Sequence, residues 1–532
     1  MRTMKPLRFA AIGAAFALVV AACGGGDEGD GGDDGADGGA SGGSYITHVS
    51  EPEQLAPSPM CYESECGAIW SMIGEPMVSV DFESGELVFD GLLESIETED
   101  NTVFTLTIKD GWTFHNGDPV DADALIRGWT WTQNEQNAAD TAGFLGKLEG
   151  AGEANPSGLE KIDDLTVEVA LSGAFVEFPK MLSFRPAFQP QAEECLQDTE
   201  ACNEQPIGIG PYMMDGPWQH NQAINLVRYE DYAGEAPAEA DSIQFKIEES
   251  LVNAFRDFSA GNIDLLRTTD PTVYPQAEGQ YADQMIQEDQ TRFTYMSFPM
   301  FEDYYKNPDL RRGISLAIDR QAIIDNVLNG IYEPSTDIVP PAMPGSRDDA
   351  CEYCTFDPEQ AKQLFEQGGG SEGDELTLFF NADAGHEGWV EAVGRQLAQN
   401  LGITFKLRPL PWDQYTNFIE EQKFTGPFRL GWSIDYPSPE NFIRPLVDSN
   451  GDSNYGGYSN EELDGFLSQG DQQDSTDGAY EFYHQAGDVA LDEMPLIPLW
   501  TGLSTIIPGD NVSNVRYDPA TDDPAFGEVT VN

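Results

Sequence analysis

Residues 376–407 read LTLFFNADAGHEGWVEAVGRQLAQNLGITFKL. Apolar residues dominate 376–380 and 403–407, so both runs are typical of strands. Residues 389–401 between them repeat apolar side chains at the spacing of one helical face. A strand, a helix and a second strand joined by short links form a parallel crossover unit, because a hairpin cannot join parallel strands. This stretch therefore predicts an α/β fold.

The same two patterns alternate through the rest of the chain. Apolar and polar residues alternate, as in half-buried strands, over 104–108, 165–171 and 243–247. Asn307-Pro308 and Asp357-Pro358 are typical helix starts, with a capping side chain followed by a proline. At 532 residues the chain is too long for one core, so we expect two or three domains.

The charge balance is strongly acidic. The chain has 93 Asp and Glu against 27 Lys and Arg, a formal net charge of −66. This argues against nucleic acid as a partner, because phosphate binding needs concentrated Lys and Arg. The acidic residues are spread along the chain, which predicts an acidic surface that salt would screen. A saline habitat is our hypothesis.

The N-terminus is typical of an exported lipoprotein. A short basic start precedes an apolar run over residues 9–22, too short to span a bilayer as a mature helix. Val20-Ala21-Ala22-Cys23 resembles a bacterial lipobox, which predicts a signal peptide over 1–22 and a lipid on Cys23. Residues 24–44 hold only Gly, Asp, Glu, Ala and Ser, so 23–44 is expected to be a lipidated cysteine and a flexible tether. An ordinary signal peptide cleaved near an Ala-x-Ala site is the alternative.

The six other cysteines fall into close pairs, which in an exported chain predicts disulfides. The pairs are Cys61 with Cys66, Cys195 with Cys202, and Cys351 with Cys354. A redox or zinc site at the last pair is the alternative, but no second close pair or histidine lies near it in sequence. His386-Glu387 also lacks the second histidine of a zinc-protease motif. We therefore expect no metal and no cofactor.

Several segments, in this order, resemble the extracytoplasmic solute-binding proteins of ABC importers, in the peptide, dipeptide and nickel-binding family. The most recognisable is LTIKDGWTFHNGDPV at 106–120. The opening EPEQLAP at 51–57, GIGPY at 208–212 and DLRRGISLAIDR at 309–320 also resemble that family. The resemblance extends from Tyr45 to about Leu499, nearly the whole body of the chain.

The resemblance implies a two-lobed periplasmic-binding-protein clamshell, type II-like, with an additional domain in the first lobe. The chain would cross between lobes more than once, and ligand would lie in the crevice between them. The expected boundaries are 45–77, 206–295 and 495–532 for the core of lobe 1, 78–205 for the additional domain, and 296–494 for lobe 2.

Residues 431–437, GWSIDYP, resemble a crevice segment of the oligopeptide-binding members. There the backbone pairs with an extended peptide as an added strand, and an aspartate holds the α-ammonium of the peptide. The resemblance therefore implies that Asp435 is the anchor and that Gly431 and Ser433 offer backbone groups. Capping a turn before Pro437 is the alternative role of Asp435.

Two tryptophans are further candidates. Trp432 neighbours the anchor and could form the wall of a side-chain pocket. Trp412 resembles, more loosely, a crevice tryptophan of the same relatives, and a core position is its alternative. No Lys or Arg is distinctive enough to be assigned to the carboxylate end of a ligand.

The resemblance implies a monomeric, lipid-anchored receptor on the outer face of the cell membrane. It would capture short peptides by hinge closure and deliver them to an ABC permease. The same fold binding an oligosaccharide, an opine or a metal chelate is the alternative. We expect no enzyme activity, because the sequence has no Gly-x-Ser-x-Gly elbow, phosphate loop or zinc signature. A secreted hydrolase is the weakest alternative.

Overall fold

The computed structural model describes residues 42–268, 271–382 and 385–532, apart from the side chains of Asp413 and Glu420. The predicted signal peptide, Cys23 and the tether up to Ser41 lie outside this part of the chain. Among the described helices, none is both long and apolar enough to cross a membrane.

Residues 44–247 contain two four-stranded sheets. The first has the order β1-β10-β9-β8 and pairs β1 in parallel with β10. The second has the order β4-β5-β7-β6 and is antiparallel. The strands are β1 (Ser44–Val49), β4 (Leu93–Thr98), β5 (Val103–Ile108), β6 (Leu159–Lys161), β7 (Thr166–Ala170), β8 (Tyr212–Met214), β9 (Ala223–Arg228) and β10 (Ser242–Ile247).

The alternating patterns form strands where they were predicted. Phe104, Leu106 and Ile108 are fully buried on one face of β5, whereas the threonines between them are partly exposed. The helices of this part are α1 (Ser64–Ile73), α2 (Ala122–Gln133), α3 (Phe178–Met181), α4 (Arg185–Phe188), α5 (Glu193–Gln197) and α6 (Thr199–Glu204). The two short strands β2 (Ser79–Val80) and β3 (Leu87–Val88) pair with each other in this part of the chain.

A seven-stranded sheet organises the second half of the chain. Its order is β11-β17-β12-β16-β14-β15, with β13 also paired to β17. Its strands are β11 (Leu265–Thr268), β12 (Ile286–Ser297), β13 (Tyr332–Pro334), β14 (Glu375–Asn381), β15 (Thr404–Leu410), β16 (Phe428–Ser433) and β17 (Leu496–Pro508). The predicted crossover unit is confirmed, because β14 and β15 are parallel and α12 (Glu387–Leu401) joins them. The α/β class is therefore correct.

The predicted helix starts after residue 300 are also confirmed. The side chains of Asn307 and Asp357 accept hydrogen bonds from the first backbone N–H groups of α9 (Pro308–Leu316) and α11 (Pro358–Gln367). The other helices of this half are α7 (Leu251–Ser259), α8 (Tyr274–Tyr281), α10 (Arg320–Asn326), α13 (Trp412–Glu420), α14 (Pro439–Val447), α15 (Glu461–Asp471) and α16 (Thr476–Glu493).

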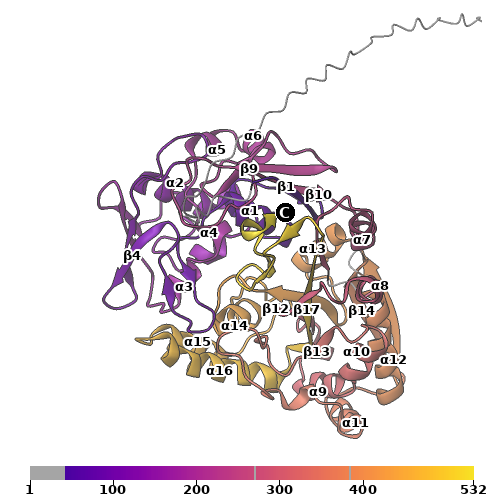
Figure 1. Cartoon of the computed structure of the whole chain (residues 1–532). Helices are drawn as coiled ribbons and strands as arrows, with labels where there is room; N and C mark the ends of the chain where they lie inside the picture. Colours follow the sequence, from indigo (N-terminus) through magenta and orange to yellow (C-terminus); the bar gives the residue numbers. More distant parts are fainter. Residues whose placement is uncertain (1–41, 269–270, 383–384) are drawn as a thin grey trace, which may run out of the picture. The chain divides into compact units, whose positions relative to one another are not determined.

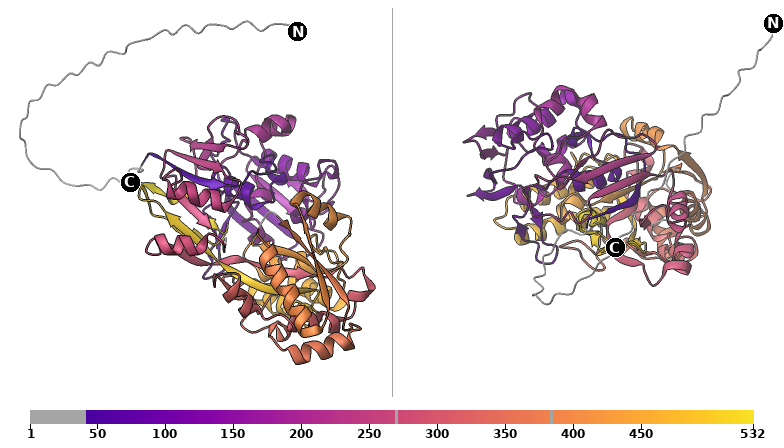
Figure 2. Two further views of the ribbon diagram at one scale, coloured as in Figure 1. Left: turned by 90° about the vertical axis from the view of Figure 1, so that its right-hand side faces the viewer. Right: turned by 45° about the horizontal axis from the view of Figure 1, so that its top comes forward.

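Two large apolar cores are linked by the long strands β12 and β17. The first core gathers residues from Tyr45 to Phe245, and the C-terminal segment, yellow in Figure 1, returns to it through Phe526 and Val529. The second gathers residues from Phe293 to Trp500. Figure 2 shows the long yellow strand β17 running towards the orange part of the chain.

β12 and β17 each contribute to both cores. β17 places Ile506 in the first core and Trp500 in the second, and its register against β12 shifts between Asp289 and Phe293. A third, small core forms around α7 and α8. Cores are not domain limits, so the boundaries predicted from the sequence stay predictions.

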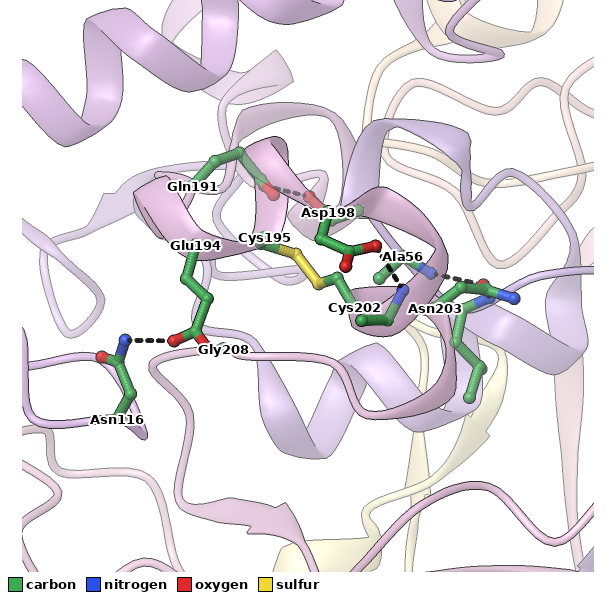
Figure 3. Close-up of a disulfide and its surroundings, with 12 residues drawn as sticks. Ala56, Asn116, Gln191, Glu194, Cys195, Asp198, Cys202, Asn203 and Gly208 are labelled. Carbon is green, nitrogen blue, oxygen red and sulfur yellow. Dashed lines mark hydrogen bonds between the residues drawn. A yellow bond between two sulfur atoms is a disulfide. The ribbon is translucent and has the colours of Figure 1, made fainter.

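The structure joins the cysteines in the three predicted pairs. The Cα atoms lie 5.7 Å apart in Cys61–Cys66, 5.0 Å in Cys195–Cys202 and 5.4 Å in Cys351–Cys354. Figure 3 shows the second of these between α5 and α6. Within the described residues, no group of three or more His, Cys, Asp or Glu side chains is placed to hold a metal ion.

Candidate ligand-binding site

A cavity of about 690 Å³ is lined by residues of both large cores. Cys61 and Val78 come from the first core and Ile434 from the second. The C-terminal segment adds Thr521 and Glu528. Cavities that hold small organic ligands have volumes of about 300–1,000 Å³, so this one has the size of a ligand site.

The strand β16 reaches this cavity with one edge unpaired. On one side it pairs with β12 from Phe428 to Ser433. On the other side β14 meets it at Phe428 alone, so residues 429–433 have no strand partner there in the described structure. Unpaired backbone groups on a strand edge are a template for an added strand. Ser433 itself lines the cavity.

Gly431 lies on this edge where space is limited. It is exposed, and a Cβ atom added there would come within 3.3 Å of the Phe293 carbonyl oxygen and the Arg429 guanidinium. A larger residue would therefore crowd the edge. This arrangement supports the backbone role predicted for Gly431 and Ser433, which stays a prediction.

Asp435 lines the cavity just beyond the end of β16. Its backbone N–H donates to Asn441 Oδ1 at 3.0 Å, and its Oδ2 accepts from Asn441 Nδ2 at 2.7 Å. Burial, and then the nearby Glu440 carboxylate, raise the pKa of the Asp435 carboxyl to about 7, although the Asn441 hydrogen bond opposes this. Among the described residues no cation forms an ion pair with it. The site can therefore accept a cation from a ligand.

The helix that follows Asp435 is capped by another residue, and capping of the turn before Pro437 stays an alternative role for Asp435. α14 begins after Ser438, whose hydroxyl accepts from the Glu440 backbone N–H. Asn441, on the first turn of α14, orients the Asp435 carboxylate instead.

The two tryptophans lie away from the described cavity lining. Trp432 pairs with Phe293 across the sheet, packs against the second core, and has an indole N–H without a described partner. Trp412 begins α13, is 39% exposed and stacks on Tyr415 at 6.1 Å. Neither side chain is among the described residues that line the cavity.

Arg429 is a candidate that the sequence analysis missed. Its partly buried guanidinium donates to Asn381 Oδ1 at 3.3 Å, while its Nε is buried without a partner. Burial lowers its pKa, and no described carboxylate pairs with it. Strand alternation puts Arg429 on the same face as Gly431 and Ser433, and that pattern could have singled it out.

His386 lies near Arg429 and also has an unused donor. Its Nδ1 accepts from the Trp389 indole at 3.2 Å, so its buried Nε2 carries the hydrogen and has no described acceptor. Burial, and then the Arg429 charge, lower the pKa of His386 to about 2. Two buried donors thus lack an acceptor at this point of the second core.

Two of the arginines that line the cavity already have carboxylate partners: Arg292 pairs with Asp522 and Arg516 with Glu528. A third lining arginine, Arg185, forms no ion pair among the described residues, and its buried Nε has no described partner. Asp435 is thus one of several lining carboxylates without an ion-pair partner, and Arg429 lies outside the described lining.

Comparisons with known proteins agree with this geometry. Residues 88–454 match the family model of the bacterial extracellular solute-binding proteins, family 5 Middle. The oligopeptide-binding protein OppA of Bacillus subtilis is 26% identical over 540 residues, covering 97% of this chain and 96% of that protein.

Solved structures show the same fold. The murein tripeptide binding protein MppA of Escherichia coli has a TM-score of 0.80 at 20% identity, covering 92% of this chain and 99% of that one. The unliganded open form of MppA has a TM-score of 0.71 at 20% identity, covering 92% and 98%. By TM-score, the described conformation therefore resembles the first of these two MppA structures more than the unliganded open form.

Proposed function

Because the chain belongs to the bacterial extracellular solute-binding proteins of family 5, we propose that it captures short peptides outside the cell and delivers them to an ABC permease. One observation carries the peptide assignment: the unpaired Asp435 carboxylate lines a ligand-sized cavity beside the free edge of β16. A peptide has an α-ammonium group that can meet the Asp435 carboxylate and an extended backbone that can pair with the free edge of β16.

The free edge would bind the peptide backbone. Main-chain hydrogen bonds to residues 430–433 form with any peptide whatever its side chains, as when a strand is added to a sheet, whereas the Arg429 carbonyl already accepts from the Tyr415 hydroxyl at 2.7 Å. Asp435 would then hold the α-ammonium, because a hydrogen bond between two charged groups is stronger and more directional than a neutral one. This contact would fix the position of the peptide along β16.

Arg429 would hold the opposite end of a short peptide. Its buried, unpaired guanidinium fits a carboxylate, which it can bind through two parallel N–H donors. Asp435 follows Arg429 by six positions, which correspond to about 20 Å of extended strand at roughly 3.3 Å per residue. That spacing favours a short oligopeptide over a single amino acid.

Capture would proceed by closing the two lobes about β12 and β17, which contribute to both large cores. Val176 packs in the second core and Tyr436 in the first, so the lobes exchange side chains in the described conformation. Opening would have to withdraw both side chains. This supports a conformation that is closed over its ligand site.

We further propose the receptor to be monomeric, without catalytic activity, and anchored by a lipid on Cys23. An oligosaccharide is the second candidate ligand, and sugar sites rely on stacked aromatic rings. Tyr62, Phe82 and Phe184 line the cavity and could serve a sugar, whereas the Asp435 carboxylate beside the free edge of β16 favours a peptide.

A retention experiment tests the ligand class. The purified protein is mixed with unblocked dipeptides to pentapeptides and with oligosaccharides, separated from free ligand, and denatured to release what it held. Mass spectrometry should find intact peptides and no sugar. Retention of sugar alone would refute the peptide assignment, and cleaved peptides would refute the absence of catalysis.

A further inference from the structure

A disulfide closes one wall of the ligand cavity. Cys61 and Cys66 are fully buried, and Cys61 lines the cavity with Tyr62, Glu63 and Ser64. Cys66 lies on the first turn of α1, where its sulfur approaches the Leu55 carbonyl. We call residues 61–64 the disulfide wall. The bond fastens this wall to a helix that is packed in the first core.

The disulfide wall carries an aromatic side chain that lines the same cavity as the proposed anchor: Tyr62 and Asp435 are both lining residues. Tyr62 is 39% exposed, and its ring meets Phe144 and Phe184 edge-on at centroid distances of 5.9 and 6.2 Å. Displacing the wall would therefore change the surroundings of the bound α-ammonium.

Few backbone hydrogen bonds hold the disulfide wall: the Cys61 N–H donates to the Ser58 carbonyl, and the Glu63 carbonyl accepts from the Gly67 N–H. The backbone N–H groups of Tyr62 and Glu63 donate to no acceptor in the described part of the chain. The Glu63 carboxylate accepts from the Glu53 backbone N–H at 2.6 Å. Burial raises the pKa of Glu63 to about 8, and the carboxylates of Glu65, Glu53 and Asp140 add to this. The neighbouring carboxylates thus disfavour the charged form of Glu63.

The other two disulfides lie elsewhere. Cys195–Cys202 joins α5 to α6 beside Asn203, whose side chain accepts from Ala56 (Figure 3). Cys351–Cys354 borders the second core. None of these four cysteines is among the described residues that line the cavity.

We propose that the Cys61–Cys66 disulfide is a positioning element for ligand binding, which holds residues 61–64 in place before the peptide arrives. The inference rests on the proposed peptide-binding function. A wall that is already ordered spares the peptide the entropy of ordering it, and this lowers Kd. The other two disulfides contribute to stability without affecting affinity.

Two double variants test this proposal. Cys61→Ala/Cys66→Ala removes the cavity disulfide, and Cys195→Ala/Cys202→Ala removes its matched control. Peptide affinity is measured by calorimetry at a temperature where both variants are folded, and each Tm is recorded. We expect Kd to rise about tenfold or more in the first variant and less than about twofold in the second, at comparable losses of Tm. Equal changes in Kd would overturn the proposal.

Amide hydrogen exchange in the unmutated protein gives a second test that needs no variant. Exchange at the Cys61 and Gly67 amides, which donate to the Ser58 and Glu63 carbonyls, should be slow without peptide and little slower with it. Fast exchange that becomes slow only on binding would show that the ligand orders the wall, which contradicts the proposal. If the unmutated protein binds no peptide at all, the proposed function fails instead.

Discussion

The substitution Asp435→Asn tests the anchor directly. It keeps the size of the side chain and an oxygen for the Asn441 amide, but removes the charge that would face a peptide ammonium. Removing one partner of a desolvated charge pair costs about 2–5 kcal/mol, because the other charge is left buried and uncompensated. At about 1.4 kcal/mol per decade, Kd should rise by roughly one and a half to three and a half decades.

A double-mutant cycle separates the anchor from general effects of charge. Calorimetric titrations compare a free and an N-acetylated peptide against wild type and Asp435→Asn. Acetylation should weaken binding strongly in wild type and much less in the variant, because both changes delete the same contact. Asp518→Asn is the matched control, since it removes a negative charge from the same cavity wall, and it should alter Kd little. Equal acetylation penalties in wild type and Asp435→Asn would refute the anchor.

Four further predictions follow from the site and the sequence. The α-ammonium of the peptide needs an ionised Asp435, and burial raises the pKa of this carboxyl to about 7. Peptide affinity should therefore rise by up to about tenfold per pH unit from pH 5 to 7 and then level off. An equal rise for the N-acetylated peptide would contradict this prediction. Arg429→Gln should weaken binding of a short peptide by about tenfold or more but hardly affect its C-terminal amide, and calorimetry with both forms decides. Cys23→Ser should release the protein from membranes or block its processing, so a processed, lipidated variant in the membrane fraction would count against the anchor. The chain should need more urea to unfold in molar salt than in low salt, because salt screens the self-repulsion that comes with a net charge of −66. A urea midpoint of unfolding that does not change with salt would argue against a saline habitat.

Local patterns carried most of the prediction of the fold. The crossover unit at 376–407 and the helix starts at Asn307 and Asp357 depend on residues a few positions apart, and these were predicted correctly. The pairing of β12 with β17 joins segments about two hundred residues apart, and no short pattern encodes its register. Strand alternation could also have placed Trp432, because it turns that side chain to the face opposite Ser433.

The binding site was harder to predict than the fold, because its candidate groups are recognised by having no described hydrogen-bond, ion-pair or strand partner. Strand alternation could have placed Arg429 on the face of Gly431 and Ser433, but it does not show which groups lack a partner. Only the folded chain shows that the Nε of Arg429 has no described acceptor and that the edge of β16 beside it is unpaired. The disulfide Cys61–Cys66 was predicted, but its place in the cavity wall depends on how α1 packs.

The two strands that contribute to both cores have a consequence for how the molecule can be divided. A fragment ending before Ile286 would lack β12 and β17, and a fragment beginning after Ser297 would lose β12, which pairs with both β16 and β17. The first fragment would leave the short strand β11 without its partner β17, and the second would expose edges of β16 and β17; such unpaired edges are the usual starting point of aggregation. Neither half of the molecule is therefore an independent module that could be exchanged between proteins, and new ligand specificities must arise by substitution around the cavity of the intact chain.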